Sequence, residues 1–290
     1  MGILIACIIL NAFIGVIFKL FHRYNINNLQ AIVINYFVCV ATAMVVKGGS
    51  PIPTDLSAQP WFYYALGLGF IFIIVFNLMA LTVQHFGVVV ATIFQKMSLI
   101  APTLLAILIY GEQAGIAKWI GILCSVLAII LLSYQKSDLP EEKKTSTLLW
   151  LFPLLTFAGS CMIDASLYLI EKKNLAQNGD IGFVASLFLF AGINGLLILT
   201  IQLFSGKTKL AWINIIGGIA LGIPNFFSIY LLVLALQQGW GGSIVFPVNN
   251  VGILVVAAIF GLVFFKEKLT PYKLAGFALA ILSIVLITMI

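Results

Sequence analysis

The sequence predicts an all-α integral membrane protein whose ten transmembrane helices form two inverted five-helix repeats. Three observations lead to this fold class. Hydrophobic residues make up 62% of the 290 residues and charged residues only 8%, with a mean hydropathy of +1.17, whereas a soluble chain has about 25% charged residues. Apolar runs of spanning length follow one another along the chain, and residues 62–134 align with residues 217–289 without a gap. The longest polar interval, residues 135–147, is too short for a soluble domain.

A transmembrane helix takes about 20 predominantly apolar residues, and five such runs lie in the first half of the chain. The run 2–21 has no basic leader and no small-residue cleavage site, so we expect a retained span and not a signal peptide. The runs 29–47 and 60–83 carry no charged residue in their middle. The run 87–110 is apolar around one central lysine, and the run 115–134 completes the half.

Five further runs make up the second half. The run 148–171 follows the polar linker and contains one acidic residue well inside it. The runs 181–204 and 211–237 contain no charged residue, the run 242–265 holds the stretch PVNN, and the run 271–290 ends the chain. The tryptophans lie at or near the ends of these runs, where the amphipathic indole ring prefers the headgroup level. They support the boundaries independently of hydropathy.

The internal repeat is carried by matched polar and small residues. Glu112 aligns with Glu267, and in both copies a lysine follows six residues later and a glycine nine residues later. Gly87 aligns with Gly242, and the stretch ALGLGF aligns with ALGIPN. Because each half holds an odd number of helices, the second half must enter the membrane from the opposite face. Inverted repeats of this kind are typical of secondary transporters, whose substrate sites lie near the bilayer midplane.

The end of the fourth helix in each half carries a recognisable pattern. The stretches IYGEQAG and FFKEKLT each place an acidic residue there, before a glycine-containing fifth helix. Together with the two five-helix halves, this pattern resembles the drug/metabolite transporter superfamily, EamA type, over essentially the whole chain. The second copy reads KE where the first keeps the usual GE. The resemblance implies a first repeat over 1–134, a polar linker over 135–147 and a second, inverted repeat over 148–290.

Lys96 is the one basic residue in the middle of a predicted span. It lies about nine residues, or roughly 13 Å, from the nearer end of its helix, which is farther than a lysine stem comfortably reaches to water. A cation at the bilayer centre costs about 2.5–3.5 kcal/mol. We therefore expect Lys96 on the wall of a central, water-accessible cavity, where it offers positive charge to an anionic or zwitterionic substrate. The alternative is an inward-reaching lysine that only stabilises packing.

Other candidate binding residues are expected at about the same membrane depth as Lys96. The PVNN stretch (247–250) is expected to interrupt its helix at the depth where Gln95 and Lys96 interrupt theirs, and paired polar breaks in corresponding helices indicate a binding site. Aromatic side chains at that level would supply apolar walls. The predicted substrate-binding residues are Lys96, Gln95, Asn249, Asn250, Asn225, Asn77, Phe94 and Phe246.

Asp164 is the one acidic residue well inside a span, about seven residues from one end, and helical rises place it about 10 Å deeper than Lys96. It is a candidate site for proton coupling, with a structural acid capped by Ser160 and Tyr168 as the alternative. Glu112 and Glu267 are expected on opposite membrane faces because of the repeat, so they cannot share a substrate. They are expected to cap or tether helix ends.

Several other functions are excluded by the residues present. The two histidines have no ligand-spaced neighbours, and the four cysteines fall in apolar runs without a C-x-x-C pair, so no metal site is predicted. No nucleophile and base share one depth, so no enzyme and no cofactor are expected. The stretch SGKTK lacks the upstream glycine of a nucleotide-binding loop, since position 201 is Ile201. Cations are scattered singly, which argues against a nucleic-acid partner.

These observations predict a secondary active transporter in the plasma (inner) membrane that moves a small metabolite by alternating access. The resemblance favours export of an amino acid or a related zwitterionic or anionic solute. An uptake carrier for a sugar, nucleoside or organic cation is the alternative, and a retinal-type lysine photoreceptor is the alternative from another class. The expected partners are the substrate, the lipid bilayer and protons as coupling ion, with the protein a monomer or homodimer. Loops on the termini-bearing side carry four Lys and Arg residues and the other side ten, which places both termini outside the cytoplasm.

Overall fold

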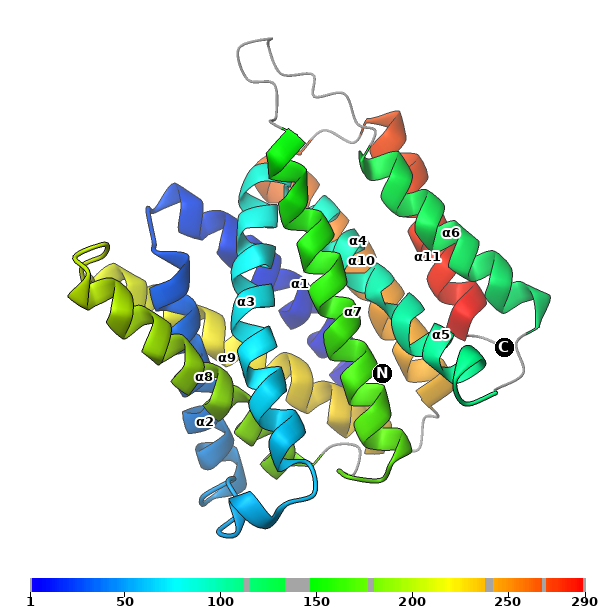
Figure 1. The fold of residues 1–290 in the computed structure, drawn as a ribbon. Helices are drawn as coiled ribbons and strands as arrows, with labels where there is room; N and C mark the ends of the chain where they lie inside the picture. The colour runs from blue at the N-terminus through cyan, green and yellow to red at the C-terminus, as the bar shows by residue number, and fades with distance from the viewer. Residues whose placement is uncertain are drawn as a thin grey trace.

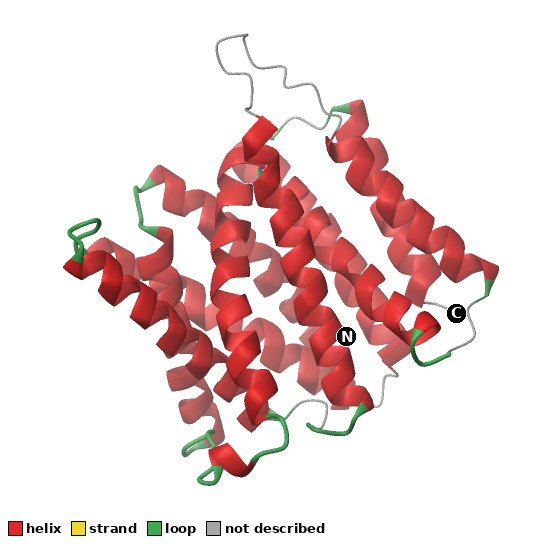
Figure 2. Cartoon of the chain, in the orientation of Figure 1, coloured by secondary structure: helices red, strands yellow, loops and turns green. Residues whose placement is uncertain are grey.

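The computed structural model describes residues 2–111, 115–133, 147–176, 180–237, 242–267 and 270–288. All regular structure in these residues is helical, as Figure 2 shows. The chain runs through the helices in the order shown in Figure 1. They are α1 (Gly2–Arg23), α2 (Asn28–Lys47), α3 (Phe62–Phe86), α4 (Val88–Lys96), α5 (Ile100–Leu108), α6 (Ile116–Ser133), α7 (Leu151–Lys172), α8 (Ile181–Phe204), α9 (Trp212–Gln237), α10 (Gly242–Phe265) and α11 (Pro271–Thr288), with 3₁₀ turns at η1 (Leu56–Ala58), η2 (Met97–Leu99) and η4 (Thr147–Trp150).

The predicted ten-span architecture is confirmed. Eight helical segments of the described chain are long and apolar enough to cross a membrane, and two shorter apolar helices, Ile116–Leu131 and Pro271–Ile287, complete the set. The fourth predicted span corresponds to α4, η2 and α5 together. Three of the tryptophans mark helix starts as expected, since Trp61 precedes α3, Trp150 precedes α7 and Trp212 opens α9.

Local sequence signals explain where several helices begin and end. The Asn27 side chain accepts a hydrogen bond from the backbone N–H of Gln30 at 3.1 Å and so caps α2. Asp180 accepts from the N–H of Gly182 at 2.8 Å at the start of α8. At the end of α2, Gly48 takes the left-handed conformation with φ 71°, which residues with a side chain adopt at a cost.

The fourth span is broken at its middle. The α-helix ends at Lys96, passes through the 3₁₀ turn η2 and resumes at Ile100. Pro102 explains the break, because its ring nitrogen cannot donate to the carbonyl of Ser98 and its ring crowds that carbonyl. The repeat places Ala257 at the corresponding position of α10, so the second half has no such residue there.

The predicted interruption of the ninth span is wrong. Helix α10 is continuous from Gly242 to Phe265, through the whole PVNN stretch. Pro247 lies only six residues into α10, so the backbone hydrogen bond that it removes is next to the poorly paired first turn and does not end the helix. The break is therefore a feature of the first half alone.

The two halves are interleaved instead of forming separate bodies. Helix α1 packs against α9 and α10, α2 against α8 and α9, α3 against α7 and α8, and α4 against α7 and α10. Helices α6 and α11, the last of each half, pair with each other at one edge of the molecule (Figure 1). This arrangement puts α4 and its break between helices of the second half.

Close backbone approach tightens the contact between α2 and α9. A Cβ atom added at Gly218 would lie 2.4 Å from the Cβ of Ile34, and one added at Gly222 would lie 2.7 Å from the Cβ of Val38. The G-x-x-x-G pattern of Gly218 and Gly222 thus acts as a helix contact.

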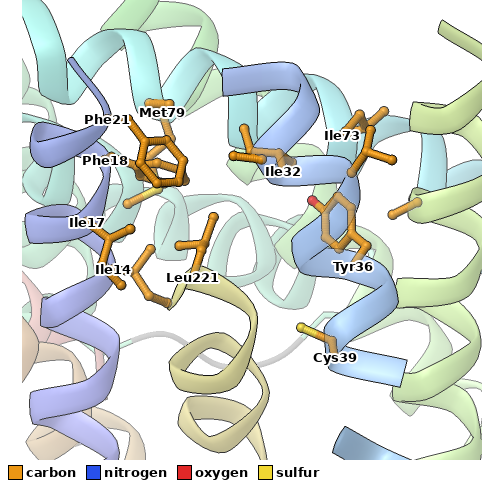
Figure 3. Close-up of a cluster of buried hydrophobic side chains, with 14 of the residues drawn as sticks. Ile14, Ile17, Phe18, Phe21, Ile32, Tyr36, Cys39, Ile73, Met79 and Leu221 are labelled. Atoms are coloured by element: carbon orange, nitrogen blue, oxygen red, sulfur yellow. The ribbon is translucent and has the colours of Figure 1, made fainter. Parts of the chain in front are cut away.

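A large apolar cluster fills the space between α1, α2, α3 and α9. Figure 3 shows Phe18, Phe21 and Met79 gathered on one side of it and Tyr36 beside Ile73 on the other. The Tyr36 hydroxyl donates a hydrogen bond to the carbonyl of Phe72 at 3.1 Å, so its one polar group is satisfied. This core holds the helices that flank the broken span.

Candidate functional site

The candidate site lies at the break between α4 and α5. All seven residues from Val88 to Phe94 are buried, whereas Gln95 and Lys96 at the end of α4 are only partly buried. Lys96 is the last residue of α4, where the negative end of the helix dipole favours a cation. At the break this lysine is therefore partly exposed and lies in a favourable local field.

Asp164 reaches the break from α7. Its carboxylate forms a hydrogen bond with the hydroxyl of Ser98, two residues beyond Lys96. The Ser98 hydroxyl also lies 2.5 Å from the carbonyl oxygen of Gln95. Counting helical rises placed Asp164 about 10 Å deeper than Lys96, and that offset is too large, because the count ignored the break and the tilt of the helices.

The charges of Lys96 and Asp164 interact electrostatically. Among the described residues they form no direct ion pair. A small charged group between them would therefore meet a cation on α4 and an acid on α7.

The thiol of Cys7 connects this level to α9 and α10. It lies 2.9 Å from the carbonyl of Ser228 on α9 and 3.4 Å from Oδ1 of Asn249 on α10, and it can donate to one of them at a time. Cys7 is also within electrostatic range of Lys96. Two polar contacts, Asp164 with Ser98 and Cys7 with Asn249, thus lie within electrostatic range of Lys96, on helices of both halves.

Two of these polar residues, Ser98 and Cys7, were not predicted as site residues from the sequence. Ser98 could have been found, because the spacing of a proline four residues beyond it predicts a helix break at its carbonyl. Cys7 carried no such signal. A cysteine in an apolar run looks like an ordinary core residue.

The remaining predicted binding residues lie in different surroundings. Asn225 is buried and its amide lies 3.1 Å from Oδ1 of Asn35 and 3.6 Å from the sulfur of Cys39, between α9 and α2. Asn77 donates to the carbonyl of Ile73 in its own helix at 2.8 Å. Both amides therefore serve helix structure, and the structure does not bring them to Lys96.

The others divide between the site and its apolar surroundings. Asn250 is partly buried and follows Asn249 in α10. Phe94 is fully buried in an apolar cluster with Ile93 and Leu254, next to the break. The side chain of Phe246 lies outside the described residues.

Glu267 caps a helix, as predicted. Its Oε1 accepts a hydrogen bond from the backbone N–H of Val88 at 2.9 Å, at the start of α4. Gly87 just before it has φ 93°, and a Cβ added there would fall 2.5 Å from Oε1. The other carboxylate oxygen, Oε2, is buried without a hydrogen-bond partner among the described residues, and the charge of Lys19 is nearby. Glu112, its repeat equivalent, lies outside the described residues.

The described residues contain no group of three or more His, Cys, Asp or Glu side chains that could hold a metal ion. The site is built from one lysine, one aspartate and uncharged donors. Such a set can bind a small polar solute and exchange a proton.

Ten spans in two interleaved halves, with a polar centre where one span breaks, define a multi-pass membrane transporter. The model of the EamA-like transporter family matches residues 151–289, which is the second half. The second half of the chain therefore matches a family of transporters, which are not enzymes. An uncharacterized protein of Haemophilus influenzae is 28% identical over 291 residues, or 97% of this chain and 95% of that protein. That similarity also covers the first half.

Proposed function

We propose that this transporter is a secondary active carrier in the plasma (inner) membrane that exports a small zwitterionic or anionic solute, such as an amino acid, by alternating access. The observation that carries the proposal is the position of Lys96, partly buried at a mid-span helix break where Ser98 contacts the carboxylate of Asp164. A carboxylate bound at Lys96 compensates the charge of the ammonium, which reduces its cost in the membrane. A substrate of this class explains why the chain keeps a cation there.

The neighbouring groups suit the rest of such a solute. Gln95, Asn249 and Asn250 provide amide donors and acceptors for its polar atoms. The fully buried Phe94 provides an apolar wall next to the break. Pockets for small molecules commonly combine apolar walls with a few oriented polar groups.

Asp164 is proposed as the coupling residue. When it is ionised, it attracts the ammonium group of a zwitterion whose carboxylate is bound to Lys96. When it takes up a proton, that attraction is lost and the solute is released. Proton and substrate thus compete for one carboxylate, and an inward proton gradient drives export.

The proposal is tested by counterflow in proteoliposomes loaded with an unlabelled mixture of L-amino acids and supplied outside with the ¹⁴C-labelled mixture. Accumulation above protein-free vesicles is expected. Lys96→Ala should lower it at least about tenfold, which corresponds to losing 1.4 kcal/mol of binding. Lys96→Arg should restore little, because a planar guanidinium differs in shape from an ammonium.

Lys47→Ala is the matched control, because Lys47 is exposed at the end of α2, and it should behave as wild type. Wild-type transport by Lys96→Ala would refute the binding role of this lysine. Parallel vesicles with labelled sugars, nucleosides or organic cations separate the alternative substrate classes, and accumulation of one of these in place of amino acids would overturn the proposed substrate class.

A further inference from the structure

The hydroxyl of Ser98 has one proton and faces two acceptors. It contacts the carbonyl oxygen of Gln95 and the Oδ2 atom of Asp164. An ionised carboxylate can only accept hydrogen bonds, so with Asp164 ionised only one of the two contacts could be a hydrogen bond. With Asp164 protonated, its O–H donates to Ser98, and Ser98 donates to Gln95. Both contacts are then hydrogen bonds, so the observed geometry fits the protonated acid.

We infer that Ser98 is a positioning residue that transmits the protonation state of Asp164 to the helix break that carries Lys96. This inference rests on the transport function proposed above. When Asp164 releases its proton to water, Ser98 turns its own proton toward the carboxylate, because an ionised acceptor binds a donor more strongly than a neutral carbonyl does. The carbonyl of Gln95 then loses the hydrogen bond from Ser98 and keeps the contact with the backbone N–H of Met97. Ser98 keeps one proton throughout.

The lost bond falls at the weakest point of the span. The 3₁₀ turn η2 has poorer hydrogen-bond geometry than an α-helix, and Pro102 cannot donate to the carbonyl of Ser98. Lys96 follows Gln95 directly, so losing this side-chain hydrogen bond loosens the backbone at the residue before the lysine and shifts the direction in which the lysine leaves it. Protonation on α7 is thereby converted into movement of the cation on α4.

The titratable groups around Asp164 are few in the described chain. Lys96 on α4 and Cys161 on α7 interact with it electrostatically, and Cys7 on α1 lies beyond Lys96. Helix α5 and the turn η4 contain no titratable residue. The titratable residues of α3 stand in its first and last turns and are Tyr63, Tyr64 and His85. On α7, Tyr168 follows Asp164 one turn later and Lys172 follows two turns later. Asp164 is therefore the group through which pH acts on the break.

Infrared spectroscopy of the purified, substrate-free protein tests this directly. The carbonyl stretch of a protonated carboxylic acid should be present at neutral pH and disappear in Asp164→Asn. It should shift in Ser98→Ala, where the acid loses its partner, and keep its position in Ser98→Thr. Absence of the band from the wild-type protein, or an unshifted band in Ser98→Ala, would overturn the inference whether or not transport is observed.

Counterflow of the labelled amino-acid mixture gives a second, functional measurement. Between about pH 6 and pH 8 we expect wild-type counterflow to change at least about fivefold, the lower end of typical coupling between two sites. In Ser98→Ala the change should fall below about twofold, and Ser98→Thr should restore it.

Ser186→Ala is the matched control, because Ser186 is equally buried and its hydroxyl bonds the carbonyl of Gly182 at 2.7 Å without a neighbouring acid. It should keep the wild-type pH profile. Equal pH profiles of Ser98→Ala and wild type would refute the positioning role while leaving the transport function intact. No counterflow by the wild type would refute the transport proposal, and the infrared result would still decide the role of Ser98.

Discussion

Replacing Gly87 by alanine should destabilise the protein through two separate effects. The backbone there has φ 93° and ψ 169°, a region that is almost restricted to glycine and costs other residues about 1–3 kcal/mol. The new Cβ would also fall 2.5 Å from Oε1 and 2.6 Å from Oε2 of Glu267. Displacing that carboxylate removes the cap of α4, which is worth about 0.5–2 kcal/mol. The expected total loss is roughly 1.5–5 kcal/mol.

The assay is thermal unfolding in detergent, followed by a thiol-reactive dye. Cys7, Cys39 and Cys124 are buried and unpaired, so they react when the bundle opens. Gly48→Ala is the control, because Gly48 also has a positive φ, 71°, but a Cβ there meets nothing within 4 Å. It should lose only about 1–2 kcal/mol, the cost of the left-handed conformation.

A double-mutant cycle separates the two effects. In a Glu267→Ala background the collision is absent, so Gly87→Ala should cost less there than in the wild type. Additive losses in the cycle, or equal losses for Gly87→Ala and Gly48→Ala, would show that the carboxylate does not hold α4 in the way described.

Three further predictions concern coupling, orientation and packing. Asp164→Asn should abolish flux driven by a pH gradient while substrate exchange remains measurable, and an unchanged dependence on the gradient would return Asp164 to a structural role. Because the termini-bearing side carries four basic residues and the other side ten, a C-terminal alkaline phosphatase fusion should be active and a fluorescent protein fusion dark; the reverse pattern would invert the orientation. Gly222→Leu should lower stability by at least about 1–3 kcal/mol, as overpacking does, since a Cβ there lies 2.7 Å from Val38. Gly67→Leu, where nothing lies within 4 Å, should leave the midpoint of unfolding nearly unchanged.

Much of the architecture could be predicted from composition and length alone. A bilayer fixes how long a helix must be and excludes other spanning structures, so apolar runs predict the helices with end errors of a few residues. The cap at Glu267 was also predictable, because the repeat placed the same acid at two helix ends. These features depend on local sequence and on the membrane.

The candidate site depends on tertiary contacts, which a single sequence does not reveal. The PVNN stretch was expected to interrupt its helix because it contains a proline. Pro247 lies near the start of α10, however, and the helix continues through it. The helix break at Pro102 was not predicted from the sequence. The partners of Asp164 were equally hidden, because helix tilt and the break shift depths by several ångströms relative to ideal rises.

The pairing of α6 with α11 has a consequence for how the chain is made. Synthesis delivers the N-terminal helices first, so α6 enters the bilayer long before its partner exists. Only when the ribosome has released α11, the last helix in the described chain, can the two meet. Helix α1 is likewise made before α9 and α10, the helices against which it packs. A chain that lacks α11 would leave α6 without its main partner at the edge of the bundle, so this edge is completed only after α11 has been made.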